Sequence, residues 1–476
     1  MNSIKQNNHF QLAVIGAGSG GLVAAEFAAK MGARVVLIEA EPVLGGECLR
    51  SGCVPSKALI HSARLFWQSG HGQSFGVTGQ PVLDFAHVTK HINDSISFIE
   101  HNHDNDGYFE QKGITVVHGK AEFVSPSVVK VRNELISFKR AIISTGSSPA
   151  IPDIPGLDSV PYLTNESIFS LRSLPRSLTI IGGGPIGCEL GQAYAMLGAR
   201  VTILQSNTRL MPRDEPEASE LILKSFSEMG IRVVLSSDIS GVSQTGRLTN
   251  VTVNGEVVSS EQLLVAVGRR PNVPIGLAEI GVLVNARGIE VDNTMRTSRS
   301  RIFAVGDCIG GVQFTHVAAQ QAGVAISNAL FGLKRTVDST MVPWVTFTTP
   351  EVAHFGTTKQ ALLDAGTTHK ASRIGFSDID KAVTENEPGY VEILTGRGGK
   401  ILGATVVGVH AAELLGQIVQ LQGLGVPLRQ VASVMQAYPT FSIGLKQLSA
   451  GVMMTKLTSG FTGRIIAFMI RLRIGA

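Results

Sequence analysis

The chain has 476 residues, 44% of them hydrophobic and 16% charged, which is typical of a globular enzyme and excludes a disordered or fibrous protein. Its length exceeds what one hydrophobic core supports, so two or three domains are expected. The formal net charge is only +4 and the basic residues are scattered, which argues against nucleic acid as a partner.

The N-terminal stretch MNSIKQNNHF is polar and leads directly into a strand-like segment, without the apolar stretch of a signal peptide. No window of the sequence approaches the ~18 continuous apolar residues of a membrane span. The four cysteines are too few for a secreted disulfide framework. We therefore expect a cytoplasmic protein, in which a close cysteine pair is typical of catalysis or metal binding.

Residues 12–39 predict a strand, a glycine turn, a helix and a second strand, with GxGxxG formed by Gly16, Gly18 and Gly21. The first glycine permits the tight turn, the second lets the backbone approach a pyrophosphate, and the third packs helix on strand. The helix N-terminus then attracts the phosphates. Glu39 ends the second strand, where a carboxylate binds ribose hydroxyls, so we predict FAD here; the alternative is a glycine turn without a ligand.

Cys48 and Cys53 follow in the segment GGECLRSGCVPSK. In a regular helix this spacing puts the Cα atoms near or beyond the ~7 Å limit for a disulfide, so we expect a local distortion that Gly52 permits. A strained or exposed bridge is easily reduced, as a catalytic disulfide requires. A zinc half-site or two unrelated thiols are the alternatives. Lys57, one helical turn further, is expected near a flavin or a thiolate, unless it is a solvated surface lysine.

A turn-rich stretch at 155–180 marks a domain boundary. Residues 178–205 then repeat the plan of the first Rossmann segment, with a second GxGxxG at Gly182, Gly184 and Gly187. Two such segments predict two bound dinucleotides.

The end of the second strand distinguishes the two sites. Gln205 occupies the position equivalent to Glu39, and it carries no charge to repel a 2′-phosphate. Ser206 and Arg209 follow closely enough to contact one. We therefore predict NADPH, with NADH as the alternative.

Two later segments complete the nucleotide-binding part. AVGRRPNVP at 266–274 marks the exit from the second Rossmann segment, and IFAVGDCIGG at 302–311 combines an apolar strand with Asp307 at its end. Cys188 and Cys308 lie inside nucleotide-binding motifs without a companion, so we expect them to be packing residues.

After Met341 the segment VPWVTFTTPEVAHFG starts a β-rich region, and helices are expected around 411–424 and 427–437, which makes a third domain. The tail from Gly460 to Ala476 alternates apolar residues with arginines: Arg464, Arg471 and Arg473. Such a tail can lie on an anionic membrane surface. More often it packs on its own dimer, which is our expectation.

These motifs resemble the pyridine nucleotide-disulfide oxidoreductase family, the class that contains dihydrolipoamide dehydrogenase, glutathione reductase and mercuric reductase. The resemblance covers nearly the whole chain and rests on GAGSGG, GGECLRSGCVPSK, STG, GGGPIGCE, VGRRPN, VGDC and VPWVTFTTPEVAHFG, in the family's order. It implies an α/β homodimer with two Rossmann-like dinucleotide-binding domains and an α+β C-terminal dimerisation domain. The implied domains are FAD-binding 1–155 with 290–340, NAD(P)-binding 156–289 and dimerisation 341–476.

The resemblance also implies roles for single residues. Hydride passes from NADPH to the flavin and then to the disulfide, with Cys48 as the exchanging thiol and Cys53 as the charge-transfer thiol. Lys57 and Glu189 lie near the flavin's reactive nitrogen, and Asp307 binds the ribityl and pyrophosphate region. The remaining expected cofactor contacts are Thr145, Gly146 and Gly268.

Two positions depart from the family pattern. The His-Pro-Thr signature, which supplies the acid/base from the partner subunit, is Tyr438-Pro439-Thr440 here, and the Glu that follows it is Ile443. Tyrosine titrates near ~10 and cannot shuttle protons near neutrality. Mercuric reductases also carry this tyrosine, but they bear a C-terminal cysteine pair that this chain lacks. Glu47 stands where the family usually has threonine beside the FAD phosphates, and we expect its carboxylate to point away.

The predicted function is an FAD-dependent NAD(P)H oxidoreductase that reduces a disulfide or, like mercuric reductase, a metal ion through Cys48 and Cys53. Tyr438 or solvent supplies the proton, and no resident metal is expected. The first alternative is a flavin dehydrogenase that reduces a quinone or another small acceptor directly. The second is a redox-sensing flavoprotein without enzymatic activity.

Overall fold

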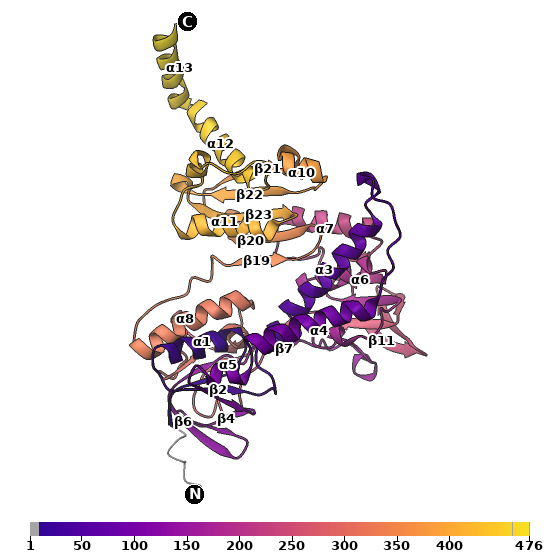
Figure 1. Ribbon diagram of the computed structural model, residues 1–476, viewed down its shortest axis with the longest axis vertical. Helices are drawn as coiled ribbons and strands as arrows, with labels where there is room; N and C mark the ends of the chain where they lie inside the picture. Colours follow the sequence, from indigo (N-terminus) through magenta and orange to yellow (C-terminus); the bar gives the residue numbers. More distant parts are fainter. Residues whose placement is uncertain (1–8, 459, 476) are drawn as a thin grey trace. The chain divides into compact units, whose positions relative to one another are not determined.

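The computed structural model describes residues 9–458 and 460–475 (Figure 1). The chain divides into two compact units. The large unit comprises Met1–Ser206 with Gly230–Ser339, and the small unit comprises Asn207–Met229 with Thr340–Ala476. The polar stretch 1–8 and the tail residue Ala476, both used in the sequence predictions, lie outside the described residues.

A seven-stranded sheet forms the centre of the large unit, with strand order β3-β2-β1-β6-β5-β4 and β18 beside β6. Its strands are β1 (His9–Ile15), β2 (Val35–Glu39), β3 (Ile114–His118), β4 (Ala121–Ser125), β5 (Val128–Val131), β6 (Glu134–Ile143) and β18 (Ile302–Ala304). The strands β1, β2, β3, β6 and β18 run parallel, whereas β4, β5 and β6 are antiparallel. Val14 lies opposite both Leu37 and Ile142, and all three are fully buried, as expected for a parallel sheet covered on both faces.

Helices α1 (Ser19–Lys30) and α8 (Thr315–Phe331) pack against each other and share an apolar cluster with β1 and β2. The helix α1 allows this close packing because Ala24, Ala25 and Ala28 are small and fully buried. A second apolar cluster joins β4, β5 and β6 to β18. The other helices of this region are α2 (Gly46–Arg50), α3 (Cys53–Gly70), α4 (Phe85–Asn102), α5 (Asp106–Glu110), and the short 3-10 helices η2 (Gln73–Phe75) and η5 (Gly306–Ile309).

A second parallel sheet in the large unit has the order β10-β9-β8-β14. Its elements are β8 (Ser177–Ile181), α6 (Pro185–Met196), β9 (Arg200–Leu204), β10 (Arg232–Val234) and β14 (Gln262–Val265), with η3 (Leu157–Ser159) and η4 (Ile168–Ser170) before them. The orders β1-α1-β2 and β8-α6-β9 confirm the predicted plan for 12–39 and 178–205.

Short antiparallel pieces complete the large unit, and the sequence patterns did not predict them. They are the sheet β11 (Ile239–Thr245), β12 (Leu248–Val253) and β13 (Glu256–Ser260), and the pairs β7 (Ser147–Pro149) with β15 (Arg269–Pro271) and β16 (Val284–Asn285) with β17 (Gly288–Ile289). The pair β7 and β15 joins the segment after the first Rossmann sheet to the predicted exit at 266–274.

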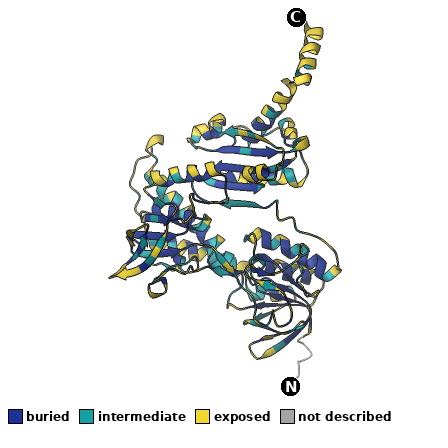
Figure 2. Cartoon of the chain, turned by 180° about the vertical axis from the view of Figure 1, so that it is seen from behind, coloured by how far each residue is buried: buried dark blue, intermediate teal, exposed yellow. Residues whose placement is uncertain are grey.

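The small unit is built on a five-stranded antiparallel sheet with the order β19-β20-β23-β22-β21. Its strands are β19 (Pro343–Thr346), β20 (Glu351–Gly356), β21 (Lys370–Gly375), β22 (Tyr390–Thr395) and β23 (Ile401–Gly408). Its helices are α7 (Pro216–Glu228), α9 (Lys359–Asp364), α10 (Asp380–Glu385), α11 (Ala411–Gly423), α12 (Ile443–Thr458), α13 (Gly460–Ile474), and the 3-10 helices η6 (Phe376–Asp378), η7 (Arg397–Gly399) and η8 (Leu428–Ser433). The central strands are buried, as Figure 2 shows, because α11 packs Leu414, Leu415 and Ile418 against the sheet.

The predicted β-rich start after Met341 and the helix at 411–424 are confirmed, but the helix expected at 427–437 is wrong. That stretch forms only the 3-10 helix η8. The hydroxyl of Ser449 donates to the Leu428 carbonyl and accepts from the Ala432 N–H, so it occupies both groups that would pair in an α-helical turn. None of the helices in the described part of the chain has the length and apolar character needed to cross a bilayer.

Candidate functional site

The first glycine turn leaves space where a ligand phosphate is expected. Gly16 has φ +99°, and a Cβ there would lie 2.3 Å from the Ser144 carbonyl oxygen. A Cβ at Gly21 would lie 1.8 Å from the Gly16 carbonyl oxygen. At Gly18, in contrast, a Cβ would meet no atom closer than 4.0 Å. The outer glycines are therefore required by the fold, and the middle one keeps the N-terminus of α1 open to an anion.

The second glycine turn has the same division of roles. Gly182 has φ +117°, with a Cβ position 2.3 Å from the Ala266 carbonyl oxygen, and a Cβ at Gly187 would lie 1.9 Å from the Gly182 carbonyl oxygen. A Cβ at Gly184 would have no neighbour within 4 Å. Both turns thus fit the approach of a dinucleotide pyrophosphate.

The residues at the ends of the two second strands hold their own glycine turns. The buried carboxylate of Glu39 accepts the backbone N–H of Ala17 at 2.6 Å and that of Glu41 at 2.9 Å. Gln205 is also buried, and its Oε1 accepts the Gly183 N–H at 3.4 Å. The carboxylate of Glu39 keeps lone pairs for ribose hydroxyls after these bonds.

The two residues predicted to contact a 2′-phosphate are placed differently. Ser206 is exposed directly after Gln205 in the large unit. Arg209 belongs to the small unit, where its guanidinium donates to the Pro212 carbonyl at 2.7 Å. The contact between Arg209 and a 2′-phosphate therefore stays a prediction.

The two cysteines lie on either side of a helix break. Cys48 lies in α2, which ends at Arg50, and Cys53 is the first residue of α3. Between them Gly52 adopts φ −118° and ψ −112°, and a Cβ there would lie 3.1 Å from the Glu47 carbonyl oxygen. This confirms the predicted distortion. In this structure both residues are thiols that share a hydrogen bond.

The electrostatic surroundings make the pair asymmetric. The hydrogen bond from Cys48, together with one from Thr315 and the charge of Lys57, lowers the pKa of Cys53 to about 6, although partial desolvation acts in the opposite direction. The same shared hydrogen bond and burial raise the pKa of Cys48. The Cys53 Sγ lies 3.4 Å from the Thr315 Oγ1, and its position at the start of α3 also favours a negative charge.

An ion pair lies next to the cysteines. The Lys57 Nζ, one turn along α3 from Cys53, lies 2.7 Å from the Glu189 Oε2 on α6. The Glu189 side chain is only 8% exposed, whereas that of Lys57 is 38% exposed. The pair that the resemblance predicted is therefore formed, and it joins the cysteine helix to the helix of the second glycine turn.

Glu47, the residue in place of the family's threonine, points toward Arg269. Its carboxylate pairs with both terminal nitrogens of Arg269 and accepts from the Asn165 amide at 2.6 Å. Burial raises the pKa of Glu47 to about 7. Its effect is larger than that of the Arg269 charge, which lowers this pKa.

Arg269 extends this network to the predicted FAD contacts. Its guanidinium donates to the Ser147 hydroxyl at 2.7 Å, and that hydroxyl donates to the Asp307 carboxylate. Nearby, the Thr145 hydroxyl donates to the Asn272 carbonyl at 2.6 Å, and the Gly146 carbonyl accepts the Asn272 N–H at 2.9 Å.

Several predicted positions thus come together where β7, β15 and η5 meet. Gly268, directly before Arg269, has φ +130° and no neighbour that would meet a Cβ. Sequence reasoning missed Asn165, Ser147 and Thr315, for which no motif gives a signal. Arg269 was visible only as part of VGRRPN.

Tyr438 lies in the small unit and its side chain is 68% exposed. Its hydroxyl donates to the Asp380 carboxylate, and this hydrogen bond raises the pKa of Tyr438 further. The phenol is therefore an even weaker acid than a free tyrosine. Asp380 is a partner that the sequence did not reveal.

The other two cysteines are fully buried, as expected for packing residues. The Cys188 Sγ lies 3.4 Å from the Gly183 carbonyl oxygen, and the Cys308 Sγ lies 3.2 Å from the Val305 carbonyl oxygen. Burial raises the pKa of Cys308 to about 11. Across residues 9–458 and 460–475, no cluster of three or more His, Cys, Asp or Glu side chains is arranged to hold a metal ion.

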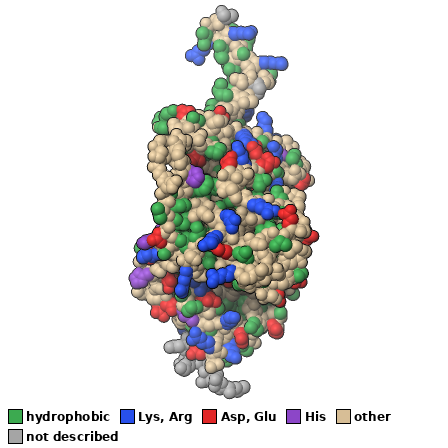
Figure 3. All heavy atoms as spheres, turned by 90° about the vertical axis from the view of Figure 1, so that its right-hand side faces the viewer, with side chains coloured by type: hydrophobic (Ala, Val, Ile, Leu, Met, Phe, Trp, Pro, Cys, Tyr) green, Lys and Arg blue, Asp and Glu red, His purple; other side chains and the backbone are tan. Residues whose placement is uncertain are grey.

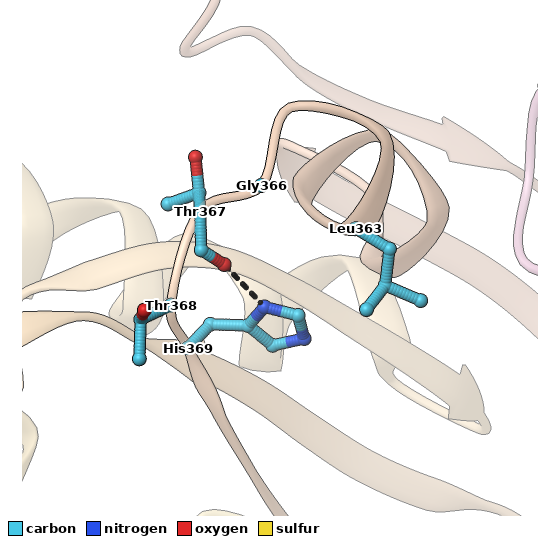
Figure 4. Close-up of a pocket in the computed structure, with 5 residues that line it drawn as sticks. All are labelled: Leu363, Gly366, Thr367, Thr368 and His369. Carbon is cyan, nitrogen blue, oxygen red and sulfur yellow. Dashed lines mark hydrogen bonds between the residues drawn. The ribbon is translucent and has the colours of Figure 1, made fainter.

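A hollow on the small unit is lined by Leu363, Gly366, Thr367, Thr368 and His369 (Figure 4). The His369 Nδ1 lies 3.0 Å from the Thr367 carbonyl oxygen. None of the predicted site residues lines this hollow, and we assign it no role.

Comparison with known proteins identifies relatives along nearly the whole chain. The model "Pyridine nucleotide-disulphide oxidoreductase" matches residues 10–322, and its dimerisation-domain companion matches residues 342–448, which supports a homodimer. A mercuric reductase of Bacillus cereus is 35% identical over 449 residues, covering 92% of this chain and 71% of that protein. A dihydrolipoyl dehydrogenase of Chlamydia muridarum is 34% identical over 446 residues, covering 92% and 95%. The HOCl-induced flavoprotein disulfide reductase RclA from Escherichia coli is 26% identical, with a TM-score of 0.83 and coverage of 93% and 99%.

Proposed function

The chain belongs to the pyridine nucleotide-disulphide oxidoreductase family, and we propose that it passes electrons from a reduced nicotinamide nucleotide, through FAD and the Cys48/Cys53 pair, to a disulfide or a metal ion. The asymmetry of the cysteine pair carries this proposal. The lowered pKa of Cys53 and the raised pKa of Cys48 give one thiolate and one thiol at neutral pH. Two unrelated packing cysteines, such as Cys188 and Cys308, have no such arrangement.

The first Rossmann segment supports FAD as the bound flavin. The space at Gly18 and the open N-terminus of α1 fit a pyrophosphate, and Glu39 has lone pairs for ribose hydroxyls. When bound, FAD supplies the two-electron chemistry between a nicotinamide and a disulfide. We assign Asp307, Thr145 and the surrounding Arg269 network to holding this cofactor in place.

The second Rossmann segment is the proposed site of NADPH. Gln205 is neutral at the position where Glu39 carries a carboxylate, so it does not repel a 2′-phosphate. The exposed Ser206 hydroxyl is available to donate to such a phosphate. NADH, which lacks this phosphate, is the second candidate.

In the proposed reaction Cys48 attacks the acceptor, and its proton must leave first because the thiolate is the nucleophile. Cys53 is a poor base for this proton, because its pKa is lowered while that of Cys48 is raised, so the proton of Cys48 must leave to solvent or to another group. Lys57 favours the thiolate on Cys53.

We favour a metal ion over a disulfide as the acceptor because of the proton that each reaction requires. A disulfide releases a thiolate that needs a proton, and Tyr438, at the position of the family's acid/base, has a raised pKa and is a poor donor near neutrality. Reduction of a thiol-bound metal ion needs no proton for a leaving thiolate. The relatives do not decide between the two acceptors, because mercuric reductases and dihydrolipoyl dehydrogenases are about equally similar to this chain.

Turnover with a panel of acceptors tests the proposal. Mercuric ion, a small disulfide and a quinone would be compared with NADPH as donor, in the wild type and in Cys48→Ser. We expect the variant to lose metal-ion and disulfide reduction, while quinone reduction shows that its flavin still works. Equal turnover of all acceptors by both proteins would mean that electrons leave directly from the flavin.

A further inference from the structure

Helix α13 (Gly460–Ile474) lies beyond the part of the chain that matches the dimerisation domain, which ends at residue 448. Its large apolar side chains are exposed, as the colours of this helix in Figure 2 show. They are Phe461, Ile465, Phe468, Met469, Ile470, Leu472 and Ile474, with exposed fractions between 41% and 79%. Ile466 is half-buried, but a helix with this many apolar side chains facing water needs a partner.

Four of these side chains share one side of the helix, whereas Ile470 and Ile474 lie on the other side. Phe461, Ile465, Phe468 and Leu472 follow one another at spacings of four, three and four residues, which places them on one side of an α-helix. Arg464 and Arg471 also lie on one side of the helix, because they are seven residues apart. In Figure 3 this helix shows hydrophobic and basic side chains together.

The charge of the segment is entirely positive. After Glu413 the sequence contains no aspartate or glutamate, whereas it contains six basic residues: Arg429, Lys446, Lys456, Arg464, Arg471 and Arg473. The three arginines of α13 are exposed. The complementary partner is therefore an apolar surface that carries negative charge.

We propose that α13 lies on the surface of a bilayer that contains anionic phospholipids, with its apolar face at the acyl boundary and its arginines on the lipid phosphates. The helix is too short to span the bilayer, because 15 residues extend only ~22 Å against a hydrocarbon core of ~30 Å. This proposal uses no residue of the redox site and does not depend on the proposed function.

The main competing partner is a second copy of this chain, which was our expectation from the sequence. Pairing two copies of α13 would bring Arg464 and Arg471 of each copy toward like charges, with no acidic residue in the segment to compensate. An anionic lipid surface attracts the same arginines, so the charge pattern favours the bilayer.

Vesicle flotation of the full-length holoprotein tests the proposal. Vesicles of phosphatidylcholine alone would be compared with vesicles that also contain phosphatidylglycerol. We expect flotation only with phosphatidylglycerol and its loss at high salt, because the attraction is screened. Absence of flotation, or equal flotation with both lipids, overturns the proposal.

Two double variants identify the determinants. Arg464→Gln with Arg471→Gln is expected to weaken vesicle binding about 25-fold, since each basic residue near an anionic surface contributes about fivefold. Phe461→Ser with Phe468→Ser is expected to abolish it. The charge-matched control, Lys370→Gln with Lys400→Gln, removes two exposed lysines elsewhere in the small unit and should bind like the wild type.

Light scattering and flavin content show whether a variant that no longer binds vesicles is still folded and still has the oligomeric state of the wild type. We expect the phenylalanine variant to retain its flavin and the oligomeric state of the wild type. If that variant becomes monomeric while it retains its flavin, α13 packs on a second copy and the proposal is wrong.

Discussion

Lys57 and Glu189 form an ion pair, with 2.7 Å between Nζ and Oε2, that connects the helix of Cys53 to the helix of the second glycine turn. The buried Glu189 carboxylate finds its countercharge on a lysine that also lowers the pKa of Cys53. One cation therefore serves both the thiolate and the contact between the two Rossmann segments.

Removal of that cation should change the titration of the thiolate. In Lys57→Met we expect the pKa of Cys53, about 6 in the wild type, to rise by about one unit, because a neighbouring positive charge is lost. The pH dependence of Cys53 alkylation in the reduced protein measures this midpoint. Lys30→Met, which removes a lysine that pairs with Glu26, is the control and should leave the midpoint unchanged. An unchanged midpoint in Lys57→Met would contradict the assigned role.

The Glu47–Arg269 pair predicts a pH-dependent stability. The pKa of Glu47 is about 7 in the fold, above its ordinary value of 4.5, so the fold favours the protonated carboxyl. As the pH rises from about 4.5 to about 7, the wild type should lose up to ~3 kcal/mol of stability that Glu47→Gln does not lose.

Thermal midpoints of the wild type and Glu47→Gln, measured across that pH range, check this slope. The difference between variant and wild type should grow in favour of the variant as the pH rises. Glu134→Gln, which alters an exposed carboxylate, should show no such trend. Parallel curves for wild type and Glu47→Gln would show that burial does not raise the pKa of this carboxyl.

Two neighbouring glycines separate folding from ligand binding. Gly187→Ala should destabilise the fold, because its Cβ would lie 1.9 Å from the Gly182 carbonyl oxygen. Gly184→Ala should fold normally, since nothing lies within 4 Å of its Cβ position, yet bind NADPH at least about tenfold more weakly. Melting curves and NADPH titrations of the two variants measure both effects. Normal NADPH affinity in Gly184→Ala would show that the pyrophosphate does not bind at this turn.

The charge at Gln205 should decide between the two nicotinamide nucleotides. We expect Gln205→Glu to lower kcat/KM for NADPH about tenfold and to spare NADH, because a carboxylate repels the 2′-phosphate. Gln205→Met keeps the size without the charge and should fall between the wild type and Gln205→Glu. If Gln205→Glu changes kcat/KM for NADPH and NADH by the same factor, the 2′-phosphate binds elsewhere.

The sequence predicted those parts of the fold in which a glycine is required by a contact with a residue nearby in the chain. Gly21 and Gly187 approach the backbone of Gly16 and Gly182 within their own turns, and this spacing is visible as GxGxxG. The distortion between Cys48 and Cys53 followed from helix geometry in the same way. Both are short-range constraints.

The parts that could not be predicted depend on contacts between distant residues. Arg269 meets Glu47 across 222 positions, and Cys53 meets Thr315 across 262, so neither pairing leaves a local pattern. The 3-10 turn at Leu428–Ser433 also depends on a hydroxyl from another helix, that of Ser449. The helix expected around 427–437 is therefore limited to this short 3-10 helix, because the competing hydroxyl was not visible in the sequence.

Anaerobic reduction with NADPH, followed by thiol alkylation and mass spectrometry, tests the central claim most directly. Cys48 and Cys53 should be protected in the oxidised holoprotein and become labelled after one equivalent of NADPH, while the buried Cys188 and Cys308 stay unlabelled throughout. If NADPH bleaches the flavin but leaves the labelling of Cys48 and Cys53 unchanged, electrons do not pass through this pair.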